Sequence, residues 1–212
     1  MAQTQQTKKS GKTREESIER ILSAASSEFV LQGFKGATVQ SIADRAALPK
    51  ANILYYFKNK ENLYHAVLDH TLKMWDEGIG DIIPSEGPRV AIEKIIEAKV
   101  HMAFKHPEAS KIYAMEIIQG APHLKEFART YQRKWVREKA ALFQQWIDSG
   151  EMLDVDPVHL IFLIWSSTQH YADFESQILT ITNRAEYEAE DIESVTQFLK
   201  SVILRGCGLM EK

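Results

Sequence analysis

Hydrophobic spacing predicts two short helices and a tight turn between residues 38 and 60. Apolar residues recur at helical spacing in the first half of TVQSIADRAALPKANILYYFKNK, and a second stripe follows a break at residues 48–49. The first stripe is Val39, Ile42, Ala43 and Ala46, and the second is Ile53, Leu54 and Phe57. This pattern is typical of a helix-turn-helix.

Helical spacing also predicts the elements on both sides of this segment. A capping box at Thr13 and Glu16 opens a helix with an apolar stripe that ends at Gly33. A long helix over about residues 59–80 follows the helix-turn-helix, and further helices are expected at about 88–105, 107–119, 122–149, 156–180 and 186–205. No strand pattern or internal repeat is present in the sequence, so the predicted class is all-α.

The second helix of the helix-turn-helix exposes polar side chains opposite its apolar stripe. Lys50, Asn52 and Tyr55 offer a cation, an amide and a phenol near the helix start. In a major groove, Asn can pair bidentately with adenine and Lys can contact guanine. Phosphate contacts are expected from helix starts at Thr38 and Lys60. The predicted DNA-contacting residues are Thr38, Lys50, Ala51, Asn52, Tyr55, Tyr56 and Lys60. The alternative is a helical corner whose polar residues are merely solvated.

This segment resembles the DNA-binding domain of the TetR family of transcriptional repressors. The resemblance covers about residues 15–75 and rests on Gly33, Phe34, Thr38 and the pattern IADRAALPKANILYYFKNKENLY. It implies an all-α fold with a three-helix reading head and a larger helical body. The chain has Ala47, Pro49 and Leu54 where the family usually has Gly, Ser and an aromatic residue. Ala47 would cost about 1 kcal/mol if its φ is positive.

Charge is unevenly distributed along the 212 residues. Residues 1–60 hold ten Lys or Arg and five Asp or Glu, a balance of +5, whereas residues 61–212 hold sixteen and twenty-four, a balance of −8. A basic first quarter suits a polyanion such as DNA. We therefore predict a disordered basic arm at 1–12, a DNA-binding domain at 13–60 that extends into the linking helix 59–80, and a ligand-binding and dimerisation domain at 81–212.

A row of polar residues interrupts the apolar helix predicted at 156–180. Residues 166–170 are all polar, and unpaired buried polar groups cost about 1–3 kcal/mol each. Trp165 and Gln169 are four residues apart on one face, an arrangement that suits a small planar heterocycle. The alternative is that the row forms hydrogen bonds within the core or across a two-fold helix bundle.

A second resemblance, nearly end to end, is to pyrimidine-sensing members of the same family. It rests on STQHYADF, the preceding DPVHLIFLIW, Trp75 and residues 107–122. It implies a homodimer that responds to uracil or thymine and regulates genes of pyrimidine metabolism. The ligand-binding residues that the resemblance suggests are Trp75, Trp165, Thr168, Gln169 and Tyr171. A regulator that senses an unrelated small ligand is the alternative.

The two C-terminal helices are the predicted dimer interface. Val195, Phe198, Leu199, Val202 and Ile203 form an apolar stripe that exceeds the needs of one subunit's core. Packing within one chain is the alternative interpretation. A two-fold dimer would place two reading heads on a palindromic operator in double-stranded DNA.

Other functional classes receive little support from the sequence. The single cysteine, Cys207, excludes an internal disulfide framework and a cysteine-rich zinc site. The sequence has no HExxH motif, glycine-rich phosphate loop or GxSxG elbow, so neither catalysis nor a metal or other cofactor is expected. An enzyme with a dispersed site and a helical adaptor that binds only protein remain as alternatives. Without a secretory signal or a long apolar run, the protein is expected to be cytoplasmic and not membrane-bound.

Overall fold

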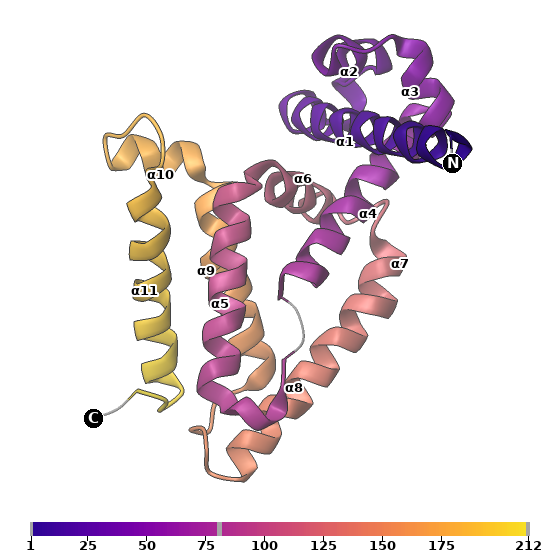
Figure 1. Cartoon of the computed structure of the whole chain (residues 1–212). Coiled ribbons are helices and arrows are strands. Elements are labelled where there is room, and N and C mark those ends of the chain that lie inside the picture. Colours follow the sequence, from indigo (N-terminus) through magenta and orange to yellow (C-terminus); the bar gives the residue numbers. More distant parts are fainter. Residues whose placement is uncertain (1, 80–81, 211–212) are drawn as a thin grey trace. The chain divides into compact units, whose positions relative to one another are not determined.

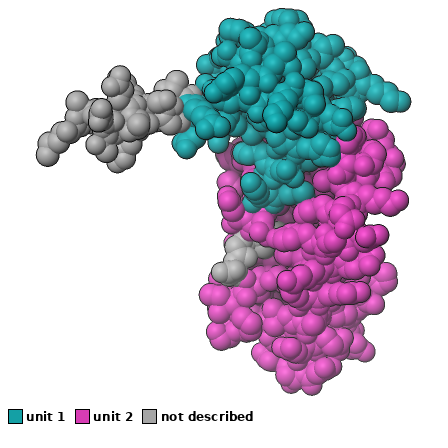
Figure 2. Space-filling model, turned by 90° about the vertical axis from the view of Figure 1, so that its right-hand side faces the viewer, with its two compact units in different colours: residues 1–73 teal, residues 74–212 magenta. Residues whose placement is uncertain are grey.

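The computed structural model describes residues 2–79 and 82–210, and the side chains of residues 14–77 and 82–210. Helices joined by turns make up these residues, and no strand occurs among them (Figure 1). The all-α prediction, with a helix-turn-helix head and a larger helical body, is confirmed. The chain divides into two compact units, Met1–Lys73 and Met74–Lys212, which are distinguished by colour in Figure 2.

The first unit contains α1 (Ala2–Gly36), α2 (Val39–Ala46), α3 (Lys50–Phe57) and most of α4 (Lys60–Ile79). The predicted apolar stripes supply most of its core because helical spacing brings them to one side of each element. Leu54 of the second stripe is the exception, because it is 40% exposed. The most deeply buried side chains are Ile21, Ala25, Phe29, Ile42, Ala43, Ile53, Leu63 and Leu68. Helix α4 crosses the boundary between the units, so one continuous helix joins head and body.

Helix α1 begins at Ala2, and Met1 and the side chains of residues 2–13 lie outside the described part of the structure. The disordered arm that we expected over residues 1–12 falls on this stretch and stays a prediction. Gly33 has φ 66° and ψ 169°, so the helical path is interrupted where the sequence predicted its end.

The turn between α2 and α3 contains a residue in the left-handed conformation, and this residue is alanine instead of glycine. Ala47 has φ 50° and ψ 45°, which is the condition under which the sequence predicted a steric cost. Arg20 of α1 supports this turn, because its Nη2 donates a 2.7 Å hydrogen bond to the carbonyl oxygen of Ala46. Pro49 is the N-cap of α3, where it has no N–H to leave unpaired.

The body is built around α5 (Gly87–Lys105) and α9 (Pro157–Asp173), which pack against each other. Helix α11 (Ala189–Gly206) packs on α5, while α6 (Pro107–Ile118) and α8 (Arg133–Asp148) pack on α9. The shorter elements are η1 (Pro84–Glu86), α7 (Lys125–Phe127), η2 (Ala128–Gln132) and α10 (Glu175–Ile181). The body core includes Ile92, Ile96, Val100, Phe143, Ile164 and Leu204.

Two predicted body helices are interrupted in the structure. The helix predicted at 122–149 begins as the short α7 and continues through the π-helical turn η2 before α8. The helix predicted at 156–180 divides at Phe174, which has φ −116° and ψ 27°. Just before this break, Asp173 accepts a 2.6 Å hydrogen bond from the hydroxyl of Ser110 on α6. A contact between segments so far apart in the sequence leaves no local hydrophobic pattern, so the pattern could not predict this break.

Candidate DNA interface and effector site

Helix α3 has one buried side and one polar side, as the sequence predicted. Ile53 is 1% exposed and anchors the helix in the head, whereas Lys50, Ala51 and Asn52 are exposed. Tyr55 is 79% exposed, and its ring contacts that of half-buried Tyr56 at 5.1 Å in an edge-on arrangement. The exposed side therefore presents a cation, an amide and a phenol on one rigid element.

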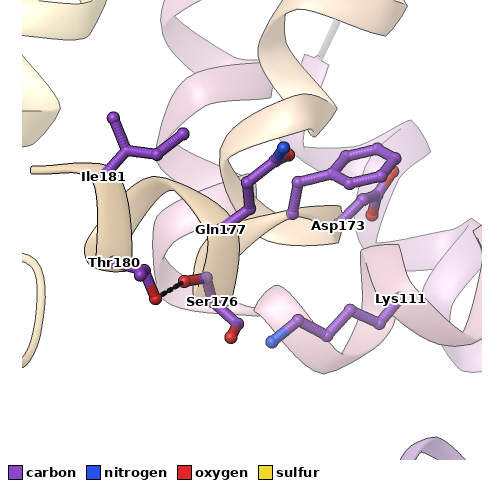
Figure 3. A pocket seen from close by; sticks show the side chains of 7 residues that line it. Lys111, Asp173, Ser176, Gln177, Thr180 and Ile181 are labelled. Atoms are coloured by element: carbon purple, nitrogen blue, oxygen red, sulfur yellow. Dashed lines mark hydrogen bonds between the residues drawn. The ribbon is translucent and has the colours of Figure 1, made fainter.

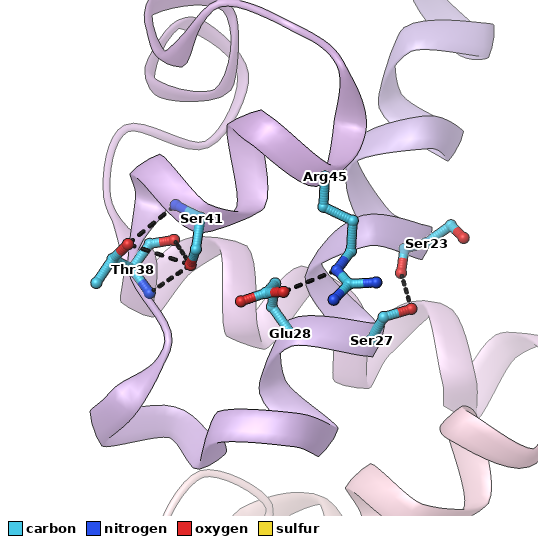
Figure 4. A network of polar contacts seen from close by, with 6 residues as sticks. All are labelled: Ser23, Ser27, Glu28, Thr38, Ser41 and Arg45. Atoms are coloured by element: carbon cyan, nitrogen blue, oxygen red, sulfur yellow. Dashed lines mark hydrogen bonds and ion pairs between the residues drawn. The ribbon is translucent and has the colours of Figure 1, made fainter.

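Thr38 fixes the start of α2. Its Oγ1 accepts a 3.0 Å hydrogen bond from the backbone N–H of Ser41, and its own backbone N–H donates to the Ser41 hydroxyl at 3.1 Å (Figure 4). This reciprocal capping box satisfies two donors at the start of the helix. The Thr38 side chain is exposed, so a DNA phosphate can approach the capped helix start.

Lys60 is placed differently from the other predicted DNA contacts. Its Nζ donates hydrogen bonds to the carbonyl oxygens of Phe34, at 2.7 Å, and Ala37, at 2.9 Å. The same ammonium lies 4.7 Å from the centroid of the Phe34 ring. The charge of Lys60 thus ties α4 to the end of α1, a role that the sequence pattern did not suggest.

An ion pair on the head also involves α1. Arg45 Nε donates to Glu28 Oε1 at 2.7 Å, and Glu28 is 7% exposed (Figure 4). An open pocket of about 440 Å³ lies beside this pair, and its lining residues are Glu19, Arg20, Ser23, Ala24, Ser27, Arg45 and Ala46. None of the predicted DNA-contacting residues lines it.

The polar row of α9 is partly satisfied by its own helix. The hydroxyls of Ser167 and Thr168 each donate at 2.7 Å to a backbone carbonyl four residues earlier. Thr168 is fully buried, while Gln169 is half-buried on the same face as half-buried Trp165. Within the described residues the Gln169 amide makes no recorded hydrogen bond, so it differs from its hydroxyl-bearing neighbours.

The predicted ligand-binding residues that carry aromatic rings have different ring partners. Trp165 lies against Trp135 at 5.7 Å and Phe162 at 5.9 Å between ring centroids. Tyr171 belongs to another group, because its ring stacks on Phe104 at 5.9 Å. The Tyr171 carbonyl also accepts a hydrogen bond from the Tyr187 hydroxyl.

Trp75 lies in a third group, which we call the Trp75 cluster and define as Trp75, Lys99, Tyr113 and Gln132. Its ring meets that of Tyr113 edge-on at 4.9 Å, and Lys99 Nζ lies 4.4 Å from its centroid. Gln132, at the end of the π-helical turn, donates a 2.9 Å hydrogen bond to the Tyr113 hydroxyl. Single π-helical turns are frequent at functional sites.

Lys99 is the functional candidate that the sequence analysis missed. It is 5% exposed, and desolvation by burial lowers its pKa from 10.5 to about 8, while the charge of Asp173 partly opposes this effect. Its position held a signal, since Lys99 follows Ile92, Ile95 and Ile96 at core-facing helical spacing. A lysine at that spacing predicts either a buried cation or a binding group.

An open pocket of about 550 Å³ lies on the body where α9 passes into α10 (Figure 3). Its lining residues are Lys111, Asp173, Phe174, Ser176, Gln177, Thr180 and Ile181. Lys111 makes a 2.5 Å ion pair with Glu175 beside it. The predicted ligand-binding residues are not among those that line this pocket.

The C-terminal apolar stripe divides between two sides of α11. Leu199 and Ile203 are 5% and 4% exposed and belong to the body core, whereas Phe198 and Val202 are 60% and 52% exposed. On α9, Phe162 and Leu163 are also about half exposed.

Neither a membrane-spanning helix nor a metal-binding group of side chains occurs among the residues that the structure describes. No helix there has the length and apolar character required to cross a bilayer. Over the same residues, no group of three or more His, Cys, Asp or Glu side chains is arranged to hold a metal ion.

Comparisons with known proteins agree with this geometry. Residues 21–67 match the model for bacterial regulatory proteins of the tetR family, and residues 68–210 match the C-terminal region of YcdC-like protein. The HTH-type transcriptional regulator RutR of Escherichia coli K12 is 37% identical over 186 residues, which cover 88% of each chain.

Solved structures share the fold at lower identity. The structure of AibR in complex with isovaleryl coenzyme A and operator DNA has a TM-score of 0.66 at 16% identity and covers 88% of this chain and 97% of that one. The ketosteroid transcriptional regulator KstR2 of Mycobacterium tuberculosis has a TM-score of 0.67 at 17% identity, with coverage of 90% and 94%.

Proposed function

The chain belongs to the tetR family of bacterial regulatory proteins, and on that premise we propose that it is a homodimeric repressor released from a palindromic operator by a pyrimidine base. It is a DNA-binding transcriptional regulator, and the relatives that it matches are regulators and not enzymes. The observation that carries the proposal is the exposed polar side of α3, held in place by buried Ile53.

Helix α3 reads the operator in this proposal. Asn52 and Lys50 contact base edges in the major groove, and Tyr55 adds a phenol beside them. Thr38 and the exposed residues at the start of α2 contact phosphate, because a helix start carries partial positive charge. Lys60 contributes mainly by holding the head together, since its ammonium is engaged by carbonyl oxygens of Phe34 and Ala37.

A second copy of the chain covers the exposed apolar side chains of α9 and α11. Phe198 and Val202 are more than half exposed, and Phe162 and Leu163 are close to half exposed on α9. A two-fold interface buries the same patch from both subunits, so one set of apolar residues on each chain is sufficient to form both sides of the interface. Two heads held in this way would match the two half-sites of a palindrome.

The effector is uracil or thymine, bound in the body. This assignment is supported by the resemblance of STQHYADF and Trp75 to pyrimidine-sensing regulators and by the pairing of Trp165 and Gln169 on one face of α9. A uracil ring offers carbonyl oxygens and N–H groups at its edge, and a glutamine amide can pair with one such edge. Trp75, Trp165, Thr168 and Gln169 are therefore the proposed ligand-binding residues. Tyr171 has its ring on Phe104, so its contribution would be indirect.

Helix α4 couples the two functions. It begins at Lys60, next to the DNA-reading helix, and continues to Trp75 in the body. A ligand shifts a conformational equilibrium by its difference in affinity for the two states. An effector that binds more tightly when the Trp75 end of α4 is in one position would therefore favour one spacing of the two heads.

The experiment that tests this proposal measures operator release by uracil in the wild type and in Gln169→Ala. We expect the variant to bind DNA normally but to lose the response to uracil. Gln177→Ala, on the surface pocket of α10, is the matched control and should respond like the wild type. Normal release of the Gln169 variant would remove that residue from the site, and release of the wild type by a different ligand class would replace the pyrimidine assignment.

A further inference from the structure

Lys99, the buried lysine of the Trp75 cluster, has no role in the proposed function. We propose that Lys99 binds the effector directly and donates a hydrogen bond from its ammonium to a carbonyl oxygen on the edge of a neutral planar ring. This inference rests on the proposed function, because it assigns Lys99 to the recognition of the same pyrimidine effector. It also predicts that the site selects neutral rings that carry a carbonyl oxygen.

The first observation is that the Lys99 ammonium makes no hydrogen bond or ion pair with the described residues. Among these residues no fully enclosed side-chain nitrogen or oxygen lacks a partner, so the ammonium borders open space. Lys99 is 5% exposed, and the structure records neither a hydrogen bond nor an ion pair to its Nζ from the described residues. Its recorded neighbour is the Trp75 ring, 4.4 Å away. A ring can attract a cation, but it accepts no conventional hydrogen bond, so the three N–H donors remain available to a ligand.

The second observation is the surroundings of this ammonium. It lies on the ring of Trp75, which is also in edge contact with Tyr113, and Tyr113 is held by a hydrogen bond from Gln132. The end of α4 and the body helices α5 and α6 thus contribute to one group of aromatic and polar side chains, and the π-helical turn η2 supports it. Aromatic walls with a few placed polar groups are typical of small-molecule sites.

The charge around Lys99 decides between ligand classes. Asp173 attracts the ammonium without forming an ion pair with it, and Ser110 holds the Asp173 carboxylate at 2.6 Å. The carboxylate would repel an anionic effector and partly balance the lysine. A neutral carbonyl oxygen can accept from Lys99 without facing that repulsion, so a lactam ring fits better than a carboxylic acid.

Burial without a partner also distinguishes a binding role from a structural one. A buried charge that serves only structure is normally paired, and an apolar residue of similar volume often stabilises the protein in its place. Groups held in unfavourable environments are frequent at functional sites. Lys99→Met should therefore stabilise the ligand-free protein while it weakens effector binding, a combination that a structural lysine would not give.

The test is calorimetric titration of the full-length wild type and Lys99→Met with uracil and two analogues, 4(3H)-pyrimidinone and 2(1H)-pyrimidinone, each of which lacks one of the two carbonyl oxygens of uracil. We expect loss of one oxygen to weaken wild-type binding about 10- to 100-fold, the range for a hydrogen bond to a charged group. The same loss should have no further effect on the variant, because the donor is already absent. Lys105→Met, in the exposed last turn of the same helix, is the matched control and should bind like the wild type.

Several results would overturn this assignment. If both analogues bind the wild type as tightly as uracil, neither carbonyl oxygen is individually required and the inference fails without reference to any variant. If Lys99→Met binds uracil normally, Lys99 is not a contact, although the proposed function survives.

Failure of the wild type to bind uracil would overturn the proposed effector, and thermal melting then decides the role of Lys99. A lower melting temperature for Lys99→Met would show a structural lysine and end the inference. A higher one would support a binding role for a neutral oxygen acceptor of another ring.

Discussion

Lys60 of α4 donates a 2.7 Å hydrogen bond to the carbonyl oxygen of Phe34 and places its ammonium 4.7 Å from the centroid of the Phe34 ring. A third contact, to the carbonyl of Ala37, completes the attachment of α4 to the end of α1. A residue that sequence spacing marks as a phosphate ligand therefore acts within the head itself.

Lys60→Met should destabilise the head. The substitution leaves two partly buried carbonyl oxygens without their charged donor, and we expect the free energy of unfolding to fall by about 1–3 kcal/mol. Chemical denaturation measures this change. Lys58→Met, at an exposed lysine two residues earlier, is the control and should alter stability by less than about 0.5 kcal/mol. Equal effects of the two substitutions would contradict the role of Lys60.

Ala47→Gly should stabilise the protein. Ala47 has φ 50°, a left-handed conformation that costs an L-residue about 1–2 kcal/mol and glycine almost nothing. Glycine is more flexible in the unfolded chain, which offsets part of the gain, so we expect a net increase of about 0.5–1 kcal/mol in the free energy of unfolding. Ala51→Gly, in the helical conformation of α3, should instead destabilise. A decrease for Ala47→Gly would show that this turn is not left-handed in solution.

Lys99 should make stability depend on pH in the alkaline range. Burial lowers its pKa from 10.5 to about 8, so between these values the unfolded chain binds more protons than the folded one. Stability contributed through this group therefore rises with pH across that window. Below pH 8 the buried charge costs about 3 kcal/mol, since each pKa unit corresponds to about 1.4 kcal/mol.

Comparison with Lys99→Met isolates this effect. The variant should exceed the wild type in stability at pH 7, and the difference should shrink as the pH rises from 8 towards 10.5. Urea unfolding at a series of pH values measures it. A difference that does not change with pH would indicate that Lys99 is not buried as a cation.

Phe198→Glu should weaken self-association. Phe198 is 60% exposed on α11, where Val202 is 52% exposed, and a buried carboxylate would be costly at a two-fold interface. Ile118→Glu is the matched control, because Ile118 is 81% exposed on α6 and outside the proposed interface. We expect sedimentation analysis to show monomers for Phe198→Glu and dimers for the control. A dimeric Phe198→Glu would redirect the interface to another surface.

Local patterns were sufficient to predict the helices and the exposed side of α3. The apolar stripes around Ile42 and Ile53 point inward because helical spacing places them on one side, and the polar residues of α3 follow on the other. Such features depend on residues within a few turns of each other, so the sequence contains the required information.

Features set by distant contacts could not be predicted. The break at Phe174 follows Asp173, which is bound to Ser110 more than sixty residues earlier, and the role of Lys60 depends on carbonyls of α1. Lys99 was missed because the sequence shows its helical spacing but not the ring of Trp75 above it.

The measurement that tests the central claim most directly is duplex binding against salt concentration, for wild type and Asn52→Ala, with and without uracil. We expect steeply salt-dependent binding to a palindromic operator, a loss of about 1–3 kcal/mol in the variant on that operator but not on random duplex, and release of the wild type by uracil. Binding that is independent of salt and equal on every duplex, or no binding at all, would contradict the account.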